Sequence, residues 1–131
     1  MAEQRRVLIL GGTGEARDLA TRAAALPGCA PITSLAGRTR QPLALATPTR
    51  VGGFGGVAGL VAYLQAAGIA ALIDATHPFA AQMSQQAAAA AARVGIPCLA
   101  LVRPPWQPEV GDRWLSVPTH AAAAALVSTL A

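Results

Sequence analysis

Short, largely apolar runs alternate with amphipathic stretches along this chain of 131 residues. Runs of the kind found in buried parallel strands occur at residues 7–10, 32–35, near 51, at 71–74 and at 98–102. Between them, apolar side chains recur at helical spacing over residues 15–26, 57–67 and 78–94. This alternation predicts an α/β fold, a Rossmann-like, doubly wound parallel sheet of about five strands in the order 3-2-1-4-5, with helices on both faces.

The helical spacing also predicts which positions face the sheet. The inward stripes are Leu19, Ala23 and Leu26 in the first helix, Val57, Leu60, Val61 and Leu64 in the second, and Phe79, Met83, Ala87, Ala90 and Val94 in the third. Pro78 is predicted in the first turn of the third helix, with Thr76 or His77 as its cap. A short segment is expected around 43–45, a strand over 114–117, and a final Ala-rich helix, capped by Thr119, that runs to the last residue.

The first apolar run leads without a gap into a glycine turn and a helix. Its candidate cofactor-binding residues are Gly11, Gly12, Thr13, Gly14 and Glu15. Glycine lets the backbone approach a ligand, and a helix start directs free N–H groups at an anion, so the turn predicts a phosphate site. Arg17 stands where a dinucleotide fingerprint has its third glycine, and a purely structural turn remains the alternative.

The loop after the second predicted strand carries no acid. Dinucleotide-binding units usually place an Asp or Glu there for the ribose 2′-hydroxyl, but none occurs between Asp18 and Asp74. Ser34, Arg38 and Thr39 instead offer hydroxyl and guanidinium groups that suit a 2′-phosphate, which favours NADPH over NADH. An exposed basic loop without a ligand is the alternative interpretation.

Two further loops follow predicted strands. The loop 52–56 contains Gly53, Phe54 and Gly55, so its backbone can lie against a flat ligand or simply form a tight turn. Beyond the fourth strand, Thr76 and His77 follow Asp74 at the carboxyl edge, where open α/β sheets bind ligands. We predict a site there, with Thr76 and His77 as candidate catalytic residues and a structural, helix-capping His77 as the alternative.

Composition limits the function classes. The chain is 53% hydrophobic and has a net charge of +4 in which every basic residue is Arg, which suits phosphate or an acidic substrate. The arginines are scattered, which argues against nucleic-acid binding. Cys29 and Cys98 lack metal or redox spacing and are expected to be reduced and packed as small apolar groups, and no metal site is predicted. The apolar run after Arg5-Arg6 is too short for a signal peptide or membrane span, so we expect a soluble, cytoplasmic protein.

Together these motifs resemble the precorrin-6A reductase family of cobalamin (vitamin B12) biosynthesis. The matching blocks are residues 9–16, 34–39, 52–56, 74–80 and 101–106, in the family's order. The block 74–80 is the most specific of them. The resemblance implies an NADPH-dependent oxidoreductase that reduces one double bond of the polycarboxylate tetrapyrrole precorrin-6A, giving precorrin-6B. A non-catalytic, NADP(H)-sensing Rossmann-type domain is the alternative.

The resemblance also implies roles for residues. Gly12, Thr13 and Gly14 would lie at the cofactor phosphates, and Arg38 with Ser34 or Thr39 would lie at the 2′-phosphate. The loop 52–56 and the Thr76-His77 turn would border the nicotinamide and the macrocycle, with His77 as the candidate proton donor. Family members have about twice this length, so residues 1–118 are expected to form one Rossmann-like domain and 119–131 a helix leading to a second, absent domain.

Overall fold

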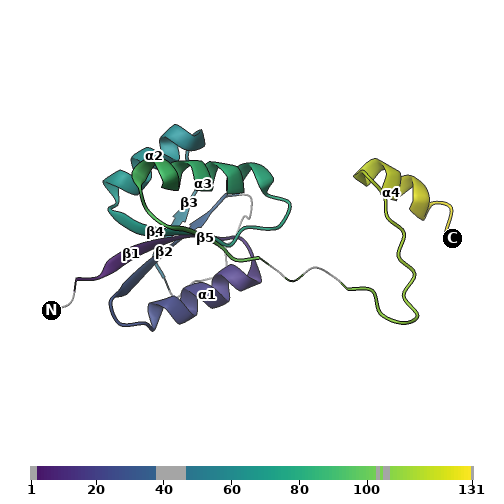
Figure 1. Ribbon diagram of the computed structural model, residues 1–131, viewed down its shortest axis with the longest axis horizontal. Helices are drawn as coiled ribbons and strands as arrows, with labels where there is room; N and C mark the ends of the chain where they lie inside the picture. Colours follow the sequence, from purple (N-terminus) through teal and green to yellow (C-terminus); the bar gives the residue numbers. More distant parts are fainter. Residues whose placement is uncertain (1–2, 38–46, 103, 105–106, 131) are drawn as a thin grey trace.

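The computed structural model of the protein describes residues 3–37, 47–102, 104 and 107–130. Strands and helices alternate through most of this range (Figure 1). The elements are β1 (Arg5–Leu10), α1 (Gly14–Ala24), β2 (Cys29–Leu35), β3 (Thr49–Val51), α2 (Gly56–Ala66), β4 (Ile69–Asp74), α3 (Ala81–Val94), β5 (Cys98–Ala100) and α4 (His120–Val127). The predicted segment at 43–45 lies outside the described residues, as do Arg38 and Thr39.

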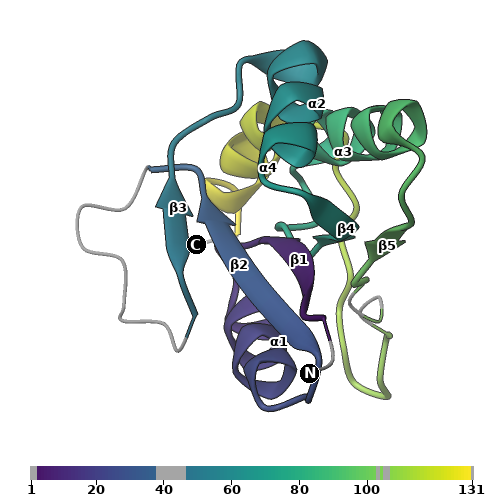
Figure 2. The same ribbon diagram turned by 90° about the vertical axis from the view of Figure 1, so that its left-hand side faces the viewer.

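The five strands form one parallel sheet in the order β3-β2-β1-β4-β5, which confirms the predicted topology (Figure 2). The central strand β1 pairs with β2 on one side and with β4 on the other. At its carboxyl end, Leu10 is in register with Ser34 on β2 and with Asp74 on β4. Two polar side chains predicted for the site are thereby held at the same level on either side of β1.

Helices cover both faces of the sheet, as predicted. Figure 1 shows α1 on one face and α2 with α3 on the other. Side chains alternate along β1, so Leu8 and Leu10 pack with the α2–α3 layer while Ile9 packs with α1. Both sets are fully or almost fully buried, which explains why β1 is continuously apolar rather than alternating.

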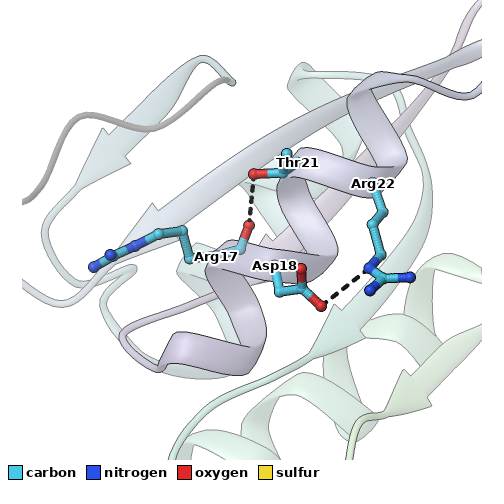
Figure 3. Close-up of polar contacts among 4 residues, drawn as sticks. All are labelled: Arg17, Asp18, Thr21 and Arg22. Carbon is cyan, nitrogen blue, oxygen red and sulfur yellow. Dashed lines mark hydrogen bonds and ion pairs between the residues drawn. The ribbon is translucent and has the colours of Figure 1, made fainter.

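The outer face of α1 is polar and its inner face is apolar. Its outer face carries an ion pair between Arg22 Nε and Asp18 Oδ2 at 3.0 Å, and Thr21 Oγ1 donates to the Arg17 carbonyl (Figure 3). Its inner face is built from three buried alanines, Ala16, Ala20 and Ala23. The prediction that Leu26 belongs to the inward stripe is wrong, because α1 ends at Ala24 and Leu26 is exposed.

The start of α3 differs from the prediction. The helix begins at Ala81, not at Pro78, and its N-cap Ala80 makes no side-chain capping bond. The preceding residues form a turn in which Ala80 N donates to the His77 carbonyl at 2.8 Å. Phe79 therefore points away from the core and is 85% exposed, whereas the rest of its predicted stripe packs as expected. In the second helix, the predicted stripe is confirmed in α2.

The C-terminal region also departs from expectation. Strand β5 ends at Ala100, and residues 114–117 form no strand within the described chain, since no neighbouring strand pairs with them. Thr119 caps α4 as predicted, its Oγ1 accepting from Ala122 N at 3.0 Å, but the helix ends at Val127. No described residue of α4 is buried, and the helix stands apart from the sheet (Figure 1).

Across the described ranges, no helix combines the length and apolar character needed to cross a membrane.

Candidate active site at the carboxyl edge of the sheet

A cavity of about 460 Å³ opens at the carboxyl ends of β1, β4 and β5. Its polar walls come from the helix start of α1, the turn after β4 and the first turns of α3; they are Thr13, Glu15, Asp74, Thr76, His77 and Ser84. The connections from β1 and β4 leave toward opposite faces of the sheet at this point. Such a switch in direction is where open α/β sheets bind ligands.

The glycine turn between β1 and α1 fits a bound phosphate. Gly12 has φ 107°, a conformation that strongly favours glycine, and a Cβ there would meet no protein atom within 4 Å. The turn is anchored by Gly11 N, which donates to the Ser34 carbonyl at 2.8 Å. Thr13 already accepts hydrogen bonds from the Ala16 and Arg17 N–H groups, and the dipole of α1 still favours an anion beside the start of this helix.

Thr13 has a structural role that the sequence did not indicate. Its Oγ1 accepts from Ala16 N at 3.0 Å, which caps α1, and donates to the Ala75 carbonyl at 2.8 Å. The hydroxyl proton of Thr13 is therefore used in the hydrogen bond to the Ala75 carbonyl, just after β4. Thr13 joins the glycine turn to the cavity wall, and its backbone N–H is the group left to contact a phosphate.

Asp74 is the most buried polar residue of the cavity wall, with 7% of its surface exposed. Its Oδ1 accepts from Thr76 N at 3.1 Å and from Thr76 Oγ1 at 2.5 Å, and Ser84 donates to the same carboxylate. Burial alone raises the pKa of Asp74, but the hydrogen bonds from Ser84 and Thr76 together outweigh it and hold the pKa below its ordinary value. The wall thus carries a negative charge at neutral pH.

His77 lies at the cavity mouth and is exposed to solvent. Its Nδ1 accepts from Phe79 N at 3.3 Å, and the two rings lie 5.1 Å apart between centroids. Because Nδ1 accepts a backbone hydrogen bond, Nε2 is the ring nitrogen that can contact a ligand at the cavity mouth. The predicted capping of α3 by His77 is wrong, since that helix begins at Ala81.

Arg50 organises the loop 52–56 and was missed at the level of the sequence. Its Nη1 and Nη2 donate to the carbonyls of Gly52 and Gly53 at 2.8 and 2.9 Å, and its guanidinium lies 3.8 Å from the centroid of the Phe54 ring. Nη1 also lies 3.5 Å from Ser34 Oγ. The signal available was an arginine directly before a strand end and a glycine-rich, Phe-containing loop.

Known proteins that resemble this chain identify its family. Residues 6–130 match the family model described as "Precorrin-6x reductase CbiJ/CobK". The chain belongs to this family. It is 55% identical to "Precorrin-6A reductase" of Rhodobacter capsulatus over 120 residues, which is 92% of this chain and 47% of the relative. It is 50% identical to "Precorrin-6A reductase" of Rhodococcus erythropolis over 125 residues, 95% of this chain and 50% of that one.

A solved structure of "CobK precorrin-6A reductase" superposes on this chain with a TM-score of 0.85 at 52% sequence identity. The match covers 93% of this chain and 48% of the solved chain. The chain thus spans about half the length of the curated relatives that it matches.

In this precorrin-6x reductase family member, the predicted site residues fall into two groups on either side of β1. Thr13, Glu15, Thr76 and His77 meet at the cavity beside β4. Ser34 lies at the end of β2, and the loop with Gly53, Phe54 and Gly55 follows β3 and is not part of the cavity wall. The prediction that Cys98 packs as an apolar group is wrong, because this residue is exposed on β5, whereas Cys29 is half-buried.

Proposed function

We propose that this chain is the cofactor-binding part of an NADPH-dependent precorrin-6A reductase of cobalamin biosynthesis. It binds NADPH and takes part in hydride transfer to the macrocycle precorrin-6A, giving precorrin-6B. One observation carries the proposal: a chain about half identical to two precorrin-6A reductases has its cavity at the sheet's change of direction, beside an open glycine turn and a helix start. The second half of the protein would complete the substrate cleft, with residues 119–131 leading to it.

The described residues fit a phosphorylated dinucleotide. The Gly12 turn and the start of α1 suit the pyrophosphate. Ser34 lies at the end of β2, where the adenine ribose binds in this fold, and we propose it for the 2′-phosphate together with Arg38 and Thr39. The loop 52–56 follows β3, next to β2, so the strand order favours the adenosine half for Gly53, Phe54 and Gly55 in place of the nicotinamide.

The Thr76–His77 turn then borders the nicotinamide and the reacting part of the macrocycle. Reduction of a double bond adds a hydride at one atom and a proton at its neighbour; the cofactor supplies the hydride, and the protein supplies placement and a proton source. We propose His77, through Nε2, as that source, with Thr76 orienting the ligand. The positive net charge of +4 suits a substrate with many carboxylates.

Titration of this chain with NADPH and NADH tests the cofactor assignment. We expect NADPH to bind more tightly, and Arg38→Ala to weaken NADPH several-fold while leaving NADH nearly unchanged. Arg93→Ala is the matched control, because it removes the same charge from the exposed last turn of α3. Failure of the chain to bind either nucleotide contradicts the proposal.

Turnover tests the chemical part. His77→Ala should lower the rate of NADPH oxidation that depends on precorrin-6A, while binding of NADPH stays close to wild type. An unchanged rate would assign His77 a structural role in the turn after β4. Tight NADPH binding without any substrate-dependent oxidation, in a protein containing both halves, would favour the NADP(H)-sensing alternative.

A further inference from the structure

Asp74 gives the cavity a buried negative charge whose use the assignments above leave open. We propose that this carboxylate makes the cavity bind the oxidised, cationic nicotinamide more favourably, relative to the reduced, neutral one, than a neutral wall would. Asp74 would thereby favour hydride donation by NADPH. The inference rests on the proposed function, because it requires the nicotinamide end of the cofactor to lie at this cavity.

The cavity wall presents acceptors and negative charge. The Thr76 hydroxyl proton is committed to Asp74, and the Thr13 hydroxyl proton is committed to the Ala75 carbonyl. Both oxygens therefore face a ligand only as acceptors. Apart from His77, none of the described lining residues is basic. A cationic ring or an N–H donor is attracted to the part of the wall that Asp74 forms.

The charge on Asp74 persists at neutral pH because three hydrogen bonds support it, two from Thr76 and one from Ser84. Its field also reaches a neighbour on the next strand. Although Cys98 as a whole residue is exposed, partial burial of its thiol raises the pKa of this group, and the negative charge of Asp74 is the second cause. Asp74 is thus a fixed charge in a part of the site where water is largely excluded from its carboxylate.

The order of the strands places the nicotinamide end near Asp74. The turn proposed for the pyrophosphate follows β1, and the residues proposed for the 2′-phosphate follow β2. A dinucleotide in this fold lies across the carboxyl ends of the strands, with its adenosine half on the β2 side and its nicotinamide half on the β4 side. The nicotinamide half then lies at the end of β4, where Asp74 is in register with Leu10 of β1.

When a hydride with its two electrons leaves the neutral dihydronicotinamide, the ring becomes a cation; the substrate gains that hydride and a proton. A fixed carboxylate beside the ring stabilises the cation more than the neutral form.

The test compares the dissociation constants of NADP⁺ and NADPH, measured by calorimetry, in wild type and Asp74→Asn. The substitution keeps the shape of the side chain and removes its charge. We expect weaker NADP⁺ binding with NADPH nearly unchanged, so that the ratio of the two constants shifts at least about tenfold, the effect of unit charges about 6 Å apart at an effective dielectric of about 40. Asp18→Asn is the control: it removes the same charge from the outer face of α1, where Asp18 pairs with Arg22 (Figure 3), and should leave the ratio unchanged.

Thr76→Val separates charge from shape, because it removes the hydroxyl that Asp74 holds but leaves the carboxylate. It should alter both affinities alike, with little effect on their ratio. If Asp74→Asn weakens NADP⁺ and NADPH equally, Asp74 only positions the turn and the inference is overturned. If wild type binds neither nucleotide, the proposed function itself fails, and the inference with it. Should thermal melting show that Asp74→Asn does not fold, Asp74→Ser, which is neutral and keeps an acceptor for Thr76 N, takes its place in the same measurement.

Discussion

The loop 52–56 can lie close to α2 only because residue 59 is a glycine. A Cβ built on Gly59 would lie 2.7 Å from the carbonyl carbon of Phe54 and nearer still to its oxygen. Ordinary contacts of a Cβ begin near 3.4 Å, and both neighbours are backbone atoms that cannot rotate away. The substitution Gly59→Ala must therefore displace either the loop or the first turns of α2.

The expected size follows from two opposing effects. Alanine in a helix interior is about 1 kcal/mol better than glycine. Overpacking against a rigid neighbour costs about 1–3 kcal/mol, and the overlap here is with backbone, so the upper part of that range applies. We expect Gly59→Ala to lower the free energy of unfolding by about 2 kcal/mol, which corresponds to about 8 °C in melting temperature for a domain of this size.

Thermal melting followed by circular dichroism measures the change. Gly14→Ala is the matched control, since Gly14 is also helical, has no positive φ, and a Cβ there would meet nothing within 4 Å. The control should be neutral or stabilising by about 0.4–1 kcal/mol, through the entropy of the unfolded chain. If Gly59→Ala melts at or above the wild-type temperature, the close approach of Phe54 to α2 is not a feature of the folded protein.

Three further predictions concern the site. Arg50→Lys should destabilise the chain by about 1–2 kcal/mol and loosen the loop 52–56, because an ammonium cannot bond two carbonyls and stack on a ring at once; a melt near wild type for Arg50→Ala as well would contradict this. Thr13→Ala should cost about 2 kcal/mol through the lost cap and the lost bond to Ala75, whereas Thr13→Ser should stay near wild type in the same denaturant titration. Because the pKa of Asp74 is lower in the folded protein than its ordinary value of 3.8, its contribution to stability is complete above that pH and is lost as the pH falls through the folded value. Asp74→Asn should therefore flatten the acid side of the stability curve, and an unchanged slope would refute the assignment.

The layering of the fold could be predicted because its signals are local. A strand buried on both faces must be apolar at successive positions, and residues 7–10 are. Alternating strands and helices then leave few possible topologies, and connections of the usual hand give the observed order. The same reasoning found the glycine turn, since a strand that runs directly into glycines and a helix is itself a local pattern.

The start of α3 could not be predicted in the same way, because two local structures compete for one sequence. The sequence Thr76-His77-Pro78 is compatible with a helix cap. In the structure, however, Thr76 donates two hydrogen bonds to Asp74, and these bonds hold Thr76 at the end of β4. The Phe79 N–H is then taken by His77 Nδ1. These bonds give partners to the Thr76 and Phe79 N–H groups, which the start of a helix would leave without partners. Residues 76–80 therefore form a turn before α3, and Phe79 is exposed.

Arg50 was missed because its role depends on pairing across the sheet. In the sequence it is one charge in a weakly patterned segment, whereas β2–β3 pairing puts it opposite Ser34. The loop after β3 then brings the Gly52 and Gly53 carbonyls and the Phe54 ring into contact with the Arg50 guanidinium. No periodicity in the chain encodes that convergence.

The separation of charge along the carboxyl edge bears on how a cofactor would be oriented. On the β2–β3 side, Arg50 and Ser34 lie together, and the helix start of α1 adds a partial positive charge beside β1. On the β4 side, the buried carboxylate of Asp74 lines the cavity. A dinucleotide phosphate carries its negative charge at the adenosine end and in the middle, while the nicotinamide end is neutral or positive. Only one direction of binding matches these two sides, so the edge would select the direction of the cofactor before any contact with the nicotinamide ring is made.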